Sequence, residues 1–225
     1  MNAYALDHVF LCCSVGGAAE AEALSRAGLT EGSPNVHPGQ GTTCRRFFFR
    51  NAFIELLWIS DVVDAASATT SPTRLLERWR GRASHASPFG IALRPAGAPA
   101  APPPSPPFES WAYRPQYLPP GLCLDMASAA PLDEPEMFYA TFGRSPAARE
   151  GAAREPMAHV LGVSQLTGVK VSIDRQIPSP AARALVRLGL ADFTTGRPLL
   201  ELELDRGARG VELDLRPIMP LILRA

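Results

Sequence analysis

The hydrophobic residues of this chain fall into short runs, each about as long as one β-strand. ALDHVFLCC, residues 5–13, is the first of these runs, and NAFIELLWI, residues 51–59, comes later. Short apolar runs bounded by turn residues are typical of buried strands. Each of these two runs also holds one residue that a buried strand should avoid, His8 in the first and Glu55 in the second.

The segments around these two runs predict the local order of elements. GGAAEAEALSRAGL favours a short helix that stops at Gly28, and TEGSPNVHPGQGTT is rich in turn residues, with room for a short strand. CRRFFFRNAFIELLWISD favours two strands hinged near Arg50 and Asn51. Residues 1–62 are therefore expected to form a first βαβββ module.

The middle of the chain predicts one helix and several strands. SPTRLLERWRGR, residues 71–82, has Ser71 as N-cap and Pro72 at the first helical position. The segment 95–107 is too rich in proline for a helix or a central strand and predicts an extended loop. The remaining elements expected here are the strand SPFGIALRP, a strand near residues 121–127, the strand PEMFYATF and a polar connection over residues 143–156.

The last third has the same element order as the beginning. VLGVSQLTGVKVSID predicts a strand or strand pair, and SPAARALVRLGL predicts a helix capped by Ser179. LLELELDRGARGVELDLR alternates apolar and charged residues, which favours an antiparallel strand pair with one solvated face. The order strand, helix, strands at both ends indicates an α+β protein with two related βαβββ modules. We expect one domain, residues 1–225, with a divergent second half over residues 85–225.

Composition restricts the partners and the compartment. Lys plus Arg and Asp plus Glu are equal at 22 each, so the charge predicts neither a nucleic-acid partner nor an anionic membrane. The four cysteines, at positions 12, 13, 44 and 123, show no CxxC spacing, which favours a reducing compartment. No run resembles a secretion signal or a membrane span, and we expect a cytoplasmic protein.

LDHVFL, the following helix, HPGQGTT and FIELLWI together resemble the glyoxalase-like branch of the vicinal oxygen chelate (glyoxalase/bleomycin resistance/dioxygenase) superfamily. The resemblance is good over residues 5–60 and looser over residues 85–140 and 160–225. It implies paired modules that form a cupped, mainly antiparallel sheet with helices outside. In metal-using members of the superfamily, a His on the first strand and a Glu on the last strand of a module bind one divalent ion. His8 and Glu55 match those positions.

Strand alternation agrees with this role. It places His8 and Phe10 on one face of the first strand, so Phe10 is a candidate substrate contact. A buried carboxylate needs a charge partner, and a metal shared with His8 would satisfy Glu55. Imidazole and carboxylate ligands suit zinc, iron, nickel or manganese. Glu55 could instead bond to His8 directly, or pair with Arg45 or Arg46.

The sequence does not reveal the remaining ligands of such a metal. Three protein ligands are usual, and FGIALR offers no His or Gln where a second module would begin. The other candidates are His159, Gln165, Glu201 and Glu203, and none stands in a sequence context that clearly matches such a ligand. A cavity without metal therefore stays open as an alternative.

Two further segments carry candidate site residues. His37 lies in a glycine-rich loop at the expected mouth of the cup, where it is either an acid–base group or an exposed loop residue. In FESWAYRPQYLPP, Trp111, Tyr113 and Tyr117 are candidate substrate contacts in a proline-stiffened wall. Arg114 should point away if Tyr113 points in. The alternative is an external brace.

The expected function is the handling of a small molecule inside the cup. The leading hypothesis is a lyase, isomerase or dioxygenase in which a metal acts as Lewis acid on vicinal oxygens, with Glu55 and His37 as catalytic groups. The alternatives are a non-catalytic binder of a drug or metabolite, and an interaction protein whose cup is filled by side chains. A homodimer is left open.

Overall fold

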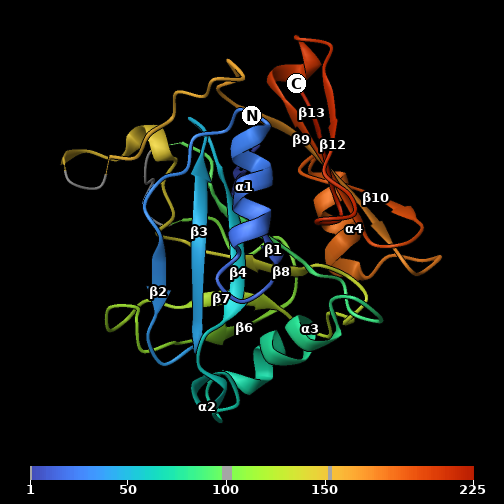
Figure 1. Cartoon of the computed structure of the whole chain (residues 1–225). Helices are drawn as coiled ribbons and strands as arrows, with labels where there is room; N and C mark the ends of the chain where they lie inside the picture. Colours follow the sequence, from blue (N-terminus) through green and yellow to red (C-terminus); the bar gives the residue numbers. More distant parts are fainter. Residues whose placement is uncertain (1, 98–102, 152–153) are drawn as a thin grey trace.

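The computed structural model describes residues 2–97, 103–151 and 154–225, and within them the chain has a mixed α/β fold with two sheets. Figure 1 shows the larger sheet formed by the first two thirds of the chain and the smaller one formed by the last third. The large sheet consists of β1 (Tyr4–Cys12), β2 (Asn35–His37), β3 (Thr42–Phe48), β4 (Phe53–Ile59), β5 (Phe89–Pro95), β6 (Ser110–Tyr113), β7 (Leu124–Ala127) and β8 (Glu136–Tyr139).

The strand order of the large sheet is β2-β3-β4-β1-β5-β8-β7-β6. β1 runs parallel to β4, β5 runs parallel to β8, and the other neighbouring pairs are antiparallel. The second four strands therefore repeat the order of the first four around the β1–β5 pair. This pairing places two strands of each half, β4 with β1 and β5 with β8, side by side at the centre of the sheet.

The two halves of the large sheet differ in their helices. α1 (Ala18–Arg26) follows β1, whereas the residues described between β5 and β6 hold no helix. The predicted proline-rich loop, residues 95–107, falls partly on 98–102, outside the described residues, and its part 103–107 is neither helix nor strand. The prediction of paired βαβββ modules is therefore not confirmed, although the α+β class is consistent with the structure.

The last third of the chain builds a sheet of its own and does not extend the large one. Its order is β10-β9-β11-β13-β12, so the predicted direct pairing of the two alternating segments is wrong. β13 is almost fully buried and takes the place between β11 and β12, which leaves the exposed acidic residues of β12 at the edge. The small sheet consists of β9 (Leu166–Ile173), β10 (Asp192–Thr195), β11 (Leu199–Leu204), β12 (Glu212–Asp214) and β13 (Leu221–Arg224).

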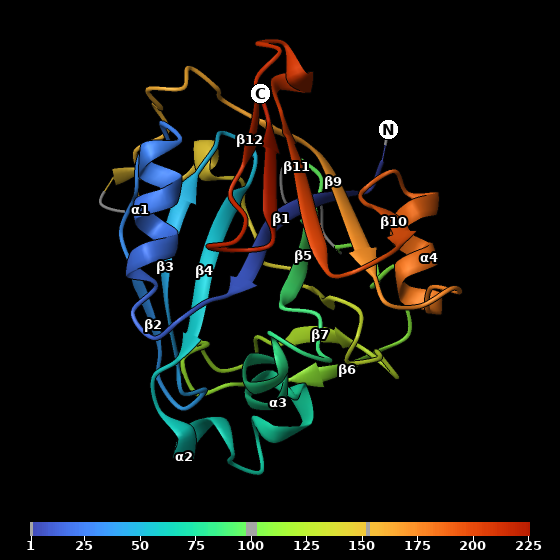
Figure 2. The ribbon, with the colours of Figure 1, turned by 45° about the vertical axis from the view of Figure 1, so that its right-hand side comes forward.

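One hydrophobic core joins the two sheets. Val9, Ile54 and Ile91 from the outer face of the large sheet pack with Leu24 of α1 and Leu202 of the small sheet. Figure 2 shows α1 and the small sheet over the same side of the large sheet. The opposite, inner face carries a second and smaller apolar cluster, and the cavity described below opens on this face.

The predicted helices are present with one change. α4 (Pro180–Arg187) is capped by Ser179, whose Oγ accepts from the Ala182 N–H at 3.2 Å. The helix expected over residues 71–82 is divided, because Arg74 has a left-handed backbone with φ of 61°. The divided and short elements are η1 (Ser71–Thr73), α3 (Leu75–Gly81), α2 (Val62–Ala65), η2 (Pro146–Ala148) and η4 (Asp205–Gly207).

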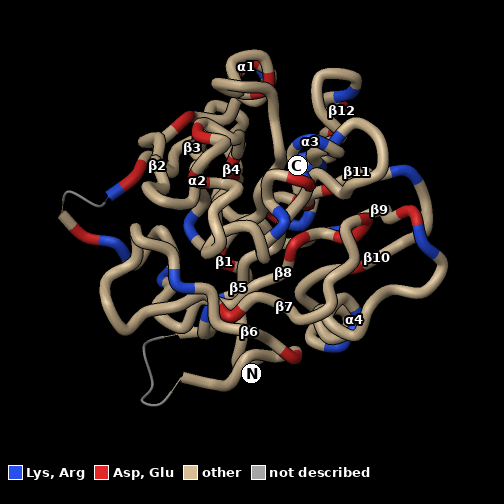
Figure 3. The backbone as a smooth tube through the Cα atoms, turned by 90° about the horizontal axis from the view of Figure 1, so that it is seen from below, with Lys and Arg blue, Asp and Glu red and all other residues tan. Residues whose placement is uncertain are grey.

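Two global properties bear on possible partners. Basic and acidic positions are interspersed along the chain, in line with its zero net charge (Figure 3). Across the described part of the chain, the helices are too short and too polar for any of them to cross a bilayer.

A substitution at Gly90 would test the packing between β1 and β5. A Cβ added there would lie 1.9 Å from Cε1 of Phe10, whose ring fills the space beside the glycine. We expect Gly90→Ala to lower the free energy of unfolding by about 1–3 kcal/mol through overpacking. Chemical denaturation measures this change.

Gly196→Ala is the matched control, because its Cβ would meet nothing nearer than 3.6 Å. It should change stability by no more than about 0.5 kcal/mol. Equal stabilities of the two variants would contradict the packing described for Phe10.

Candidate functional site

A cavity of about 370 Å³ opens on the inner face of the large sheet. Both halves of the sheet line the cavity, and its walls combine apolar and ionisable side chains. Its ionisable residues are Asp7, His8, His37, Arg46, Tyr113, Tyr117, Glu55, Glu136, Arg144 and Arg149. Its apolar lining includes Phe10, Phe53, Leu57, Leu75, Leu118, Leu124, Met126 and Phe138.

A β-bulge in β1 places two adjacent residues on the cavity side. Leu6 pairs with Leu93 and His8 pairs with Ala92, so Asp7 is an extra residue in the ladder. Leu6 packs in the core on the outer face, while both Asp7 and His8 line the cavity. Bulges are frequent next to functional sites because they redirect a side chain in this way.

Two histidines approach the carboxylate of Glu55. The parallel pairing of β1 with β4 sets His8 opposite Phe53 and Phe10 opposite Glu55. His8 Nε2 lies 3.5 Å from Glu55 Oε2, and His37 Nε2 lies 3.9 Å from Glu55 Oε1. Each imidazole therefore approaches a different oxygen of one buried carboxylate, and His37 Nε2 also lies 3.0 Å from Asn35 Nδ2.

The orientation of the His8 ring is fixed by contacts on the side away from Glu55. Its Nδ1 lies 2.7 Å from Asp7 Oδ1, and its ring stacks on Phe53 with centroids 4.5 Å apart. Asp7 in turn lies 3.9 Å from Nε of Arg94. With Nδ1 held by Asp7, the other ring nitrogen is directed at Glu55.

His37 is the last residue of β2, where the sequence indicated a loop. Its side chain is only 12% exposed, so the alternative of an exposed loop histidine is wrong. Nδ1 lies 2.9 Å from Thr42 Oγ1, which also accepts from Gln40 Nε2 at 2.7 Å. Tyr117 donates to Gln40 Oε1 at 3.3 Å, and its ring packs against His37.

Burial lowers the pKa of His37. The imidazole is therefore largely neutral at neutral pH, which is the form that a metal ligand or a general base requires.

The HPGQGT segment owes its shape to its glycines. Gly41 has φ of 74°, and a Cβ there would lie 2.1 Å from the carbonyl oxygen of Asp61.

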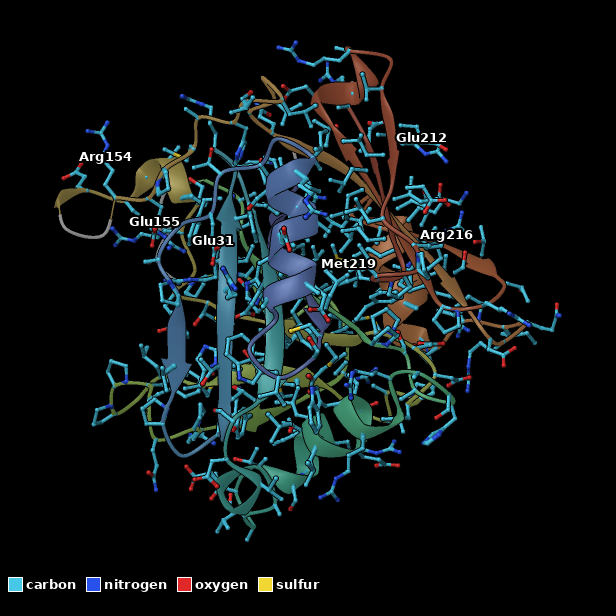
Figure 4. The ribbon with its side chains drawn as sticks, viewed as in Figure 1. Glu31, Arg154, Glu155, Glu212, Arg216 and Met219 are labelled. Atoms are coloured by element: carbon cyan, nitrogen blue, oxygen red, sulfur yellow. The ribbon has the colours of Figure 1, made fainter. Side chains whose placement is uncertain are left out.

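The two arginines that could have paired with Glu55 have other partners. Arg45 forms a bidentate pair with Glu31, with N···O distances of 2.6 and 2.7 Å. Arg46 donates to Ser33 and lies 3.5 Å from Glu155, which sits on the connection beside β3 (Figure 4). The alternative in which Arg45 or Arg46 neutralises Glu55 therefore does not hold.

Cys44 is a further neighbour of Glu55. His37, Cys44 and Glu55 each offer one atom within 4.8 Å of the others. Yet Cys44 is fully buried and does not line the cavity, and burial together with the Glu55 carboxylate raises its thiol pKa. Because a thiol binds metal as thiolate, this environment disfavours Cys44 as a ligand. His8 lines the cavity and lies 3.5 Å from Glu55, although it is not part of that close group.

Glu136, on β8, is an ionisable group that the sequence analysis did not identify. It lines the cavity, it is 5% exposed, and its Oε1 has no hydrogen-bond partner in the described residues. Burial raises its pKa to about 7, a rise that the nearby Arg78 guanidinium moderates. A carboxyl group of this kind can both give and take a proton near neutrality.

The aromatic segment contributes two of its three candidates. Tyr113 and Tyr117 line the cavity, and the Tyr113 hydroxyl lies 3.1 Å from Thr70 Oγ1. Trp111 does not line it. It borders a smaller neighbouring cavity with Met126, its partner in the β6–β7 pairing. Arg114 is outside the cavity, as alternation predicts.

The candidate ligands from the last third are elsewhere. His159 accepts from the Thr30 N–H and contacts the Phe48 carbonyl, and Glu201 pairs with Lys170 and Arg224. Neither these two residues nor Gln165 and Glu203 line the cavity. Strands β9 to β13 form the small sheet, and none of the described residues after Arg149 lines the cavity.

Sequence reasoning missed three groups of the site for different reasons. The sequence did not indicate Asp7, because regular strand alternation would place its side chain on the face opposite His8. Arg149 lies in a segment that the sequence presents only as a polar connection. Glu136 did carry a usable signal: like Glu55, it is a carboxylate beside an apolar strand run, in EMFY.

Comparisons with known proteins agree with this topology. Residues 6–102 match the model of a family described as glyoxalase-like domain. This part of the chain, from β1 to β5, is thus a glyoxalase-like domain of the vicinal oxygen chelate superfamily. A search of curated proteins found no match.

One similar solved structure is a hypothetical protein from Staphylococcus aureus, with a TM-score of 0.53 and 8% identity over 98% of both chains. At that identity the similarity concerns the fold alone. It extends the likeness to the whole chain, including the small sheet.

The raised pKa of Glu136 predicts a pH dependence of stability. The folded state holds the proton up to about pH 7, whereas the unfolded chain releases it near 4.5. The contribution of Glu136 is therefore fully present below pH 4.5 and is lost as pH rises through 7. The free energy of unfolding should fall by at most about 3 kcal/mol over this range.

Glu136→Gln removes the titrating group and keeps its shape. The difference in unfolding free energy between wild type and Glu136→Gln should change over the same pH range. Parallel stability curves for the two proteins would show that Glu136 does not titrate there.

Proposed function

We propose that this protein binds a small oxygenated molecule in the cavity, next to a divalent metal ion held by His8, His37 and Glu55. The observation that carries the proposal is the approach of two imidazoles to the two oxygens of one buried carboxylate. Without a cation, Glu55 would face the cavity with no arginine or lysine partner among the described residues. A bound cation supplies the missing charge.

The residues present fit such an ion. Asp7 on His8 reproduces the carboxylate–histidine arrangement that orients metal-binding imidazoles. The lowered pKa of His37 favours its neutral, coordinating form. Two imidazoles and one carboxylate suit zinc, iron, nickel or manganese.

The second half of the sheet supports the same site. Glu136 on β8 stands opposite Gly90 of the parallel strand β5, as Glu55 on β4 stands opposite Phe10 of β1. We interpret β5–β8 as a second module that lacks the helix of the first. In that interpretation, Glu55 and Glu136 occupy related positions and face one cavity.

The two carboxyl groups have different roles in the proposed reaction. A bound divalent ion would act as a Lewis acid toward two neighbouring oxygens of the ligand. Glu136, with a pKa of about 7, would take a proton from the ligand and return it to another position. The apolar walls limit water around the reacting atoms. This combination favours an isomerase or lyase acting on a vicinal-oxygen substrate.

The donor set also favours a second reaction class. Two histidines and one carboxylate with open positions are the ligands of non-haem iron dioxygenases. Retention of Fe(II) in preference to Zn(II), together with oxygen uptake, would identify this class.

Metal binding is the direct test. Protein purified without chelator should contain close to one equivalent of a divalent transition metal by elemental analysis. His8→Gln and Glu55→Gln should fold but bind the metal more weakly. The loss of affinity should exceed about 10–100-fold, which is the effect of removing a residue that only supports a ligand. Circular dichroism verifies folding of each variant.

His159→Gln is the matched control, because His159 is buried outside the cavity. It should keep the metal affinity of the wild type. Metal affinity that is unchanged in Glu55→Gln would contradict the proposed centre. If the wild type binds no metal, the proposed centre is wrong, and the cavity is that of a protein that binds small molecules without metal.

A further inference from the structure

One end of the cavity is cationic. Arg46, Arg144 and Arg149 all line it. Arg46 is engaged by Ser33 and Glu155, so its charge is already partly matched. The charge of the other two is available to a ligand.

Arg149 is the best positioned of these arginines. It follows η2, which is anchored by the Ala147 N–H donating to the Arg50 carbonyl at 3.0 Å. Its guanidinium carbon lies 5.5 Å from the ring centroids of both Phe48 and Phe53. Within the described ranges, this guanidinium makes neither a hydrogen bond nor an ion pair. Two aromatic rings thus hold a cation whose donors are free.

Arg149 and the proposed metal ligand His8 contact the same aromatic ring. This ring is that of Phe53, which is stacked on His8. The cavity also has an apolar lining, and Leu75, Leu124 and Met126 belong to the same apolar cluster within it. A ligand that spans the cavity would therefore place an anionic group on Arg149, polar atoms near His8 and an apolar group against this lining.

We propose that the ligand is a small 2-oxo or 2-hydroxy carboxylate with an apolar tail, and that Arg149 binds its carboxylate. The placement of the ligand's 2-oxygen near His8 rests on the proposed function; the recognition of the carboxylate by Arg149 does not. A guanidinium fork matches a carboxylate in a bidentate geometry. Asp7 and Glu55 face the same cavity, and their charges disfavour a doubly charged phosphate.

The test compares an acid with its neutral amide. The probes are 3-phenyllactate and 3-phenyllactamide, which share the 2-hydroxyl group and the aromatic tail. Isothermal titration calorimetry on the full chain, with zinc added and with chelator, gives both affinities. The acid should bind at least about 10-fold more tightly than the amide, because hydrogen bonds between charged groups are stronger than those to a neutral group.

Arg149→Gln should weaken binding of the acid about 10–100-fold and leave binding of the amide nearly unchanged. Arg82→Gln is the matched control, since Arg82 also stacks on an aromatic ring, Trp79 at 4.6 Å, but lies outside the cavity. It should bind both probes as the wild type does. If Arg149→Gln does not fold, the salt dependence of binding to the wild type tests the proposal instead. Added salt should weaken binding of the acid and not of the amide.

Equal affinities for acid and amide would overturn the proposal. So would an unchanged affinity of the acid in folded Arg149→Gln, or no binding of either probe at millimolar concentration. Discrimination between acid and amide that persists with chelator, in a protein that binds no metal, would refute the metal centre and leave the role of Arg149 intact.

Discussion

The site depends on one constraint, the burial of the Glu55 carboxylate on a central strand of the large sheet. Such a group costs several kcal/mol unless it is neutralised or paired. Arg45 and Arg46, on the neighbouring strand, have other carboxylate partners. The groups that remain near Glu55 are His8 and His37, together with the thiol of Cys44. The arrangement of the inner face follows from how these groups satisfy the carboxylate.

The scaffold holds these groups on regular elements and supports each from behind. His8 stands on β1, with Asp7 on Nδ1 and Phe53 against its ring. His37 ends β2 and is held by Thr42. Packing on the opposite face of the same strands joins the large sheet to α1 and the small sheet. The core therefore fixes the strands, and the strands position the site.

The sequence predicted most of the strands, because their apolar runs have the length of a strand and their breaks are marked by Gly, Pro and Asn. It did not predict β6 and β10, which are short and partly polar. It singled out His8 and Glu55 because each interrupts such a run. It could not reveal the bulge at Asp7, since a bulge depends on the register with β5 and leaves no pattern in β1 alone. It also could not place β13 between β11 and β12, because burial decides which of three short strands is central. Arg149 reaches the cavity only through long-range packing of an irregular segment.

The central claim is that the centre is formed by His8, His37 and Glu55, without the thiol of Cys44. X-ray absorption spectroscopy of the zinc-loaded protein tests it most directly. The account predicts a shell of nitrogen and oxygen scatterers at about 2.0–2.1 Å, with histidine features. A sulfur scatterer at about 2.3 Å would show that Cys44 binds the metal as thiolate, and would contradict this assignment of the ligands.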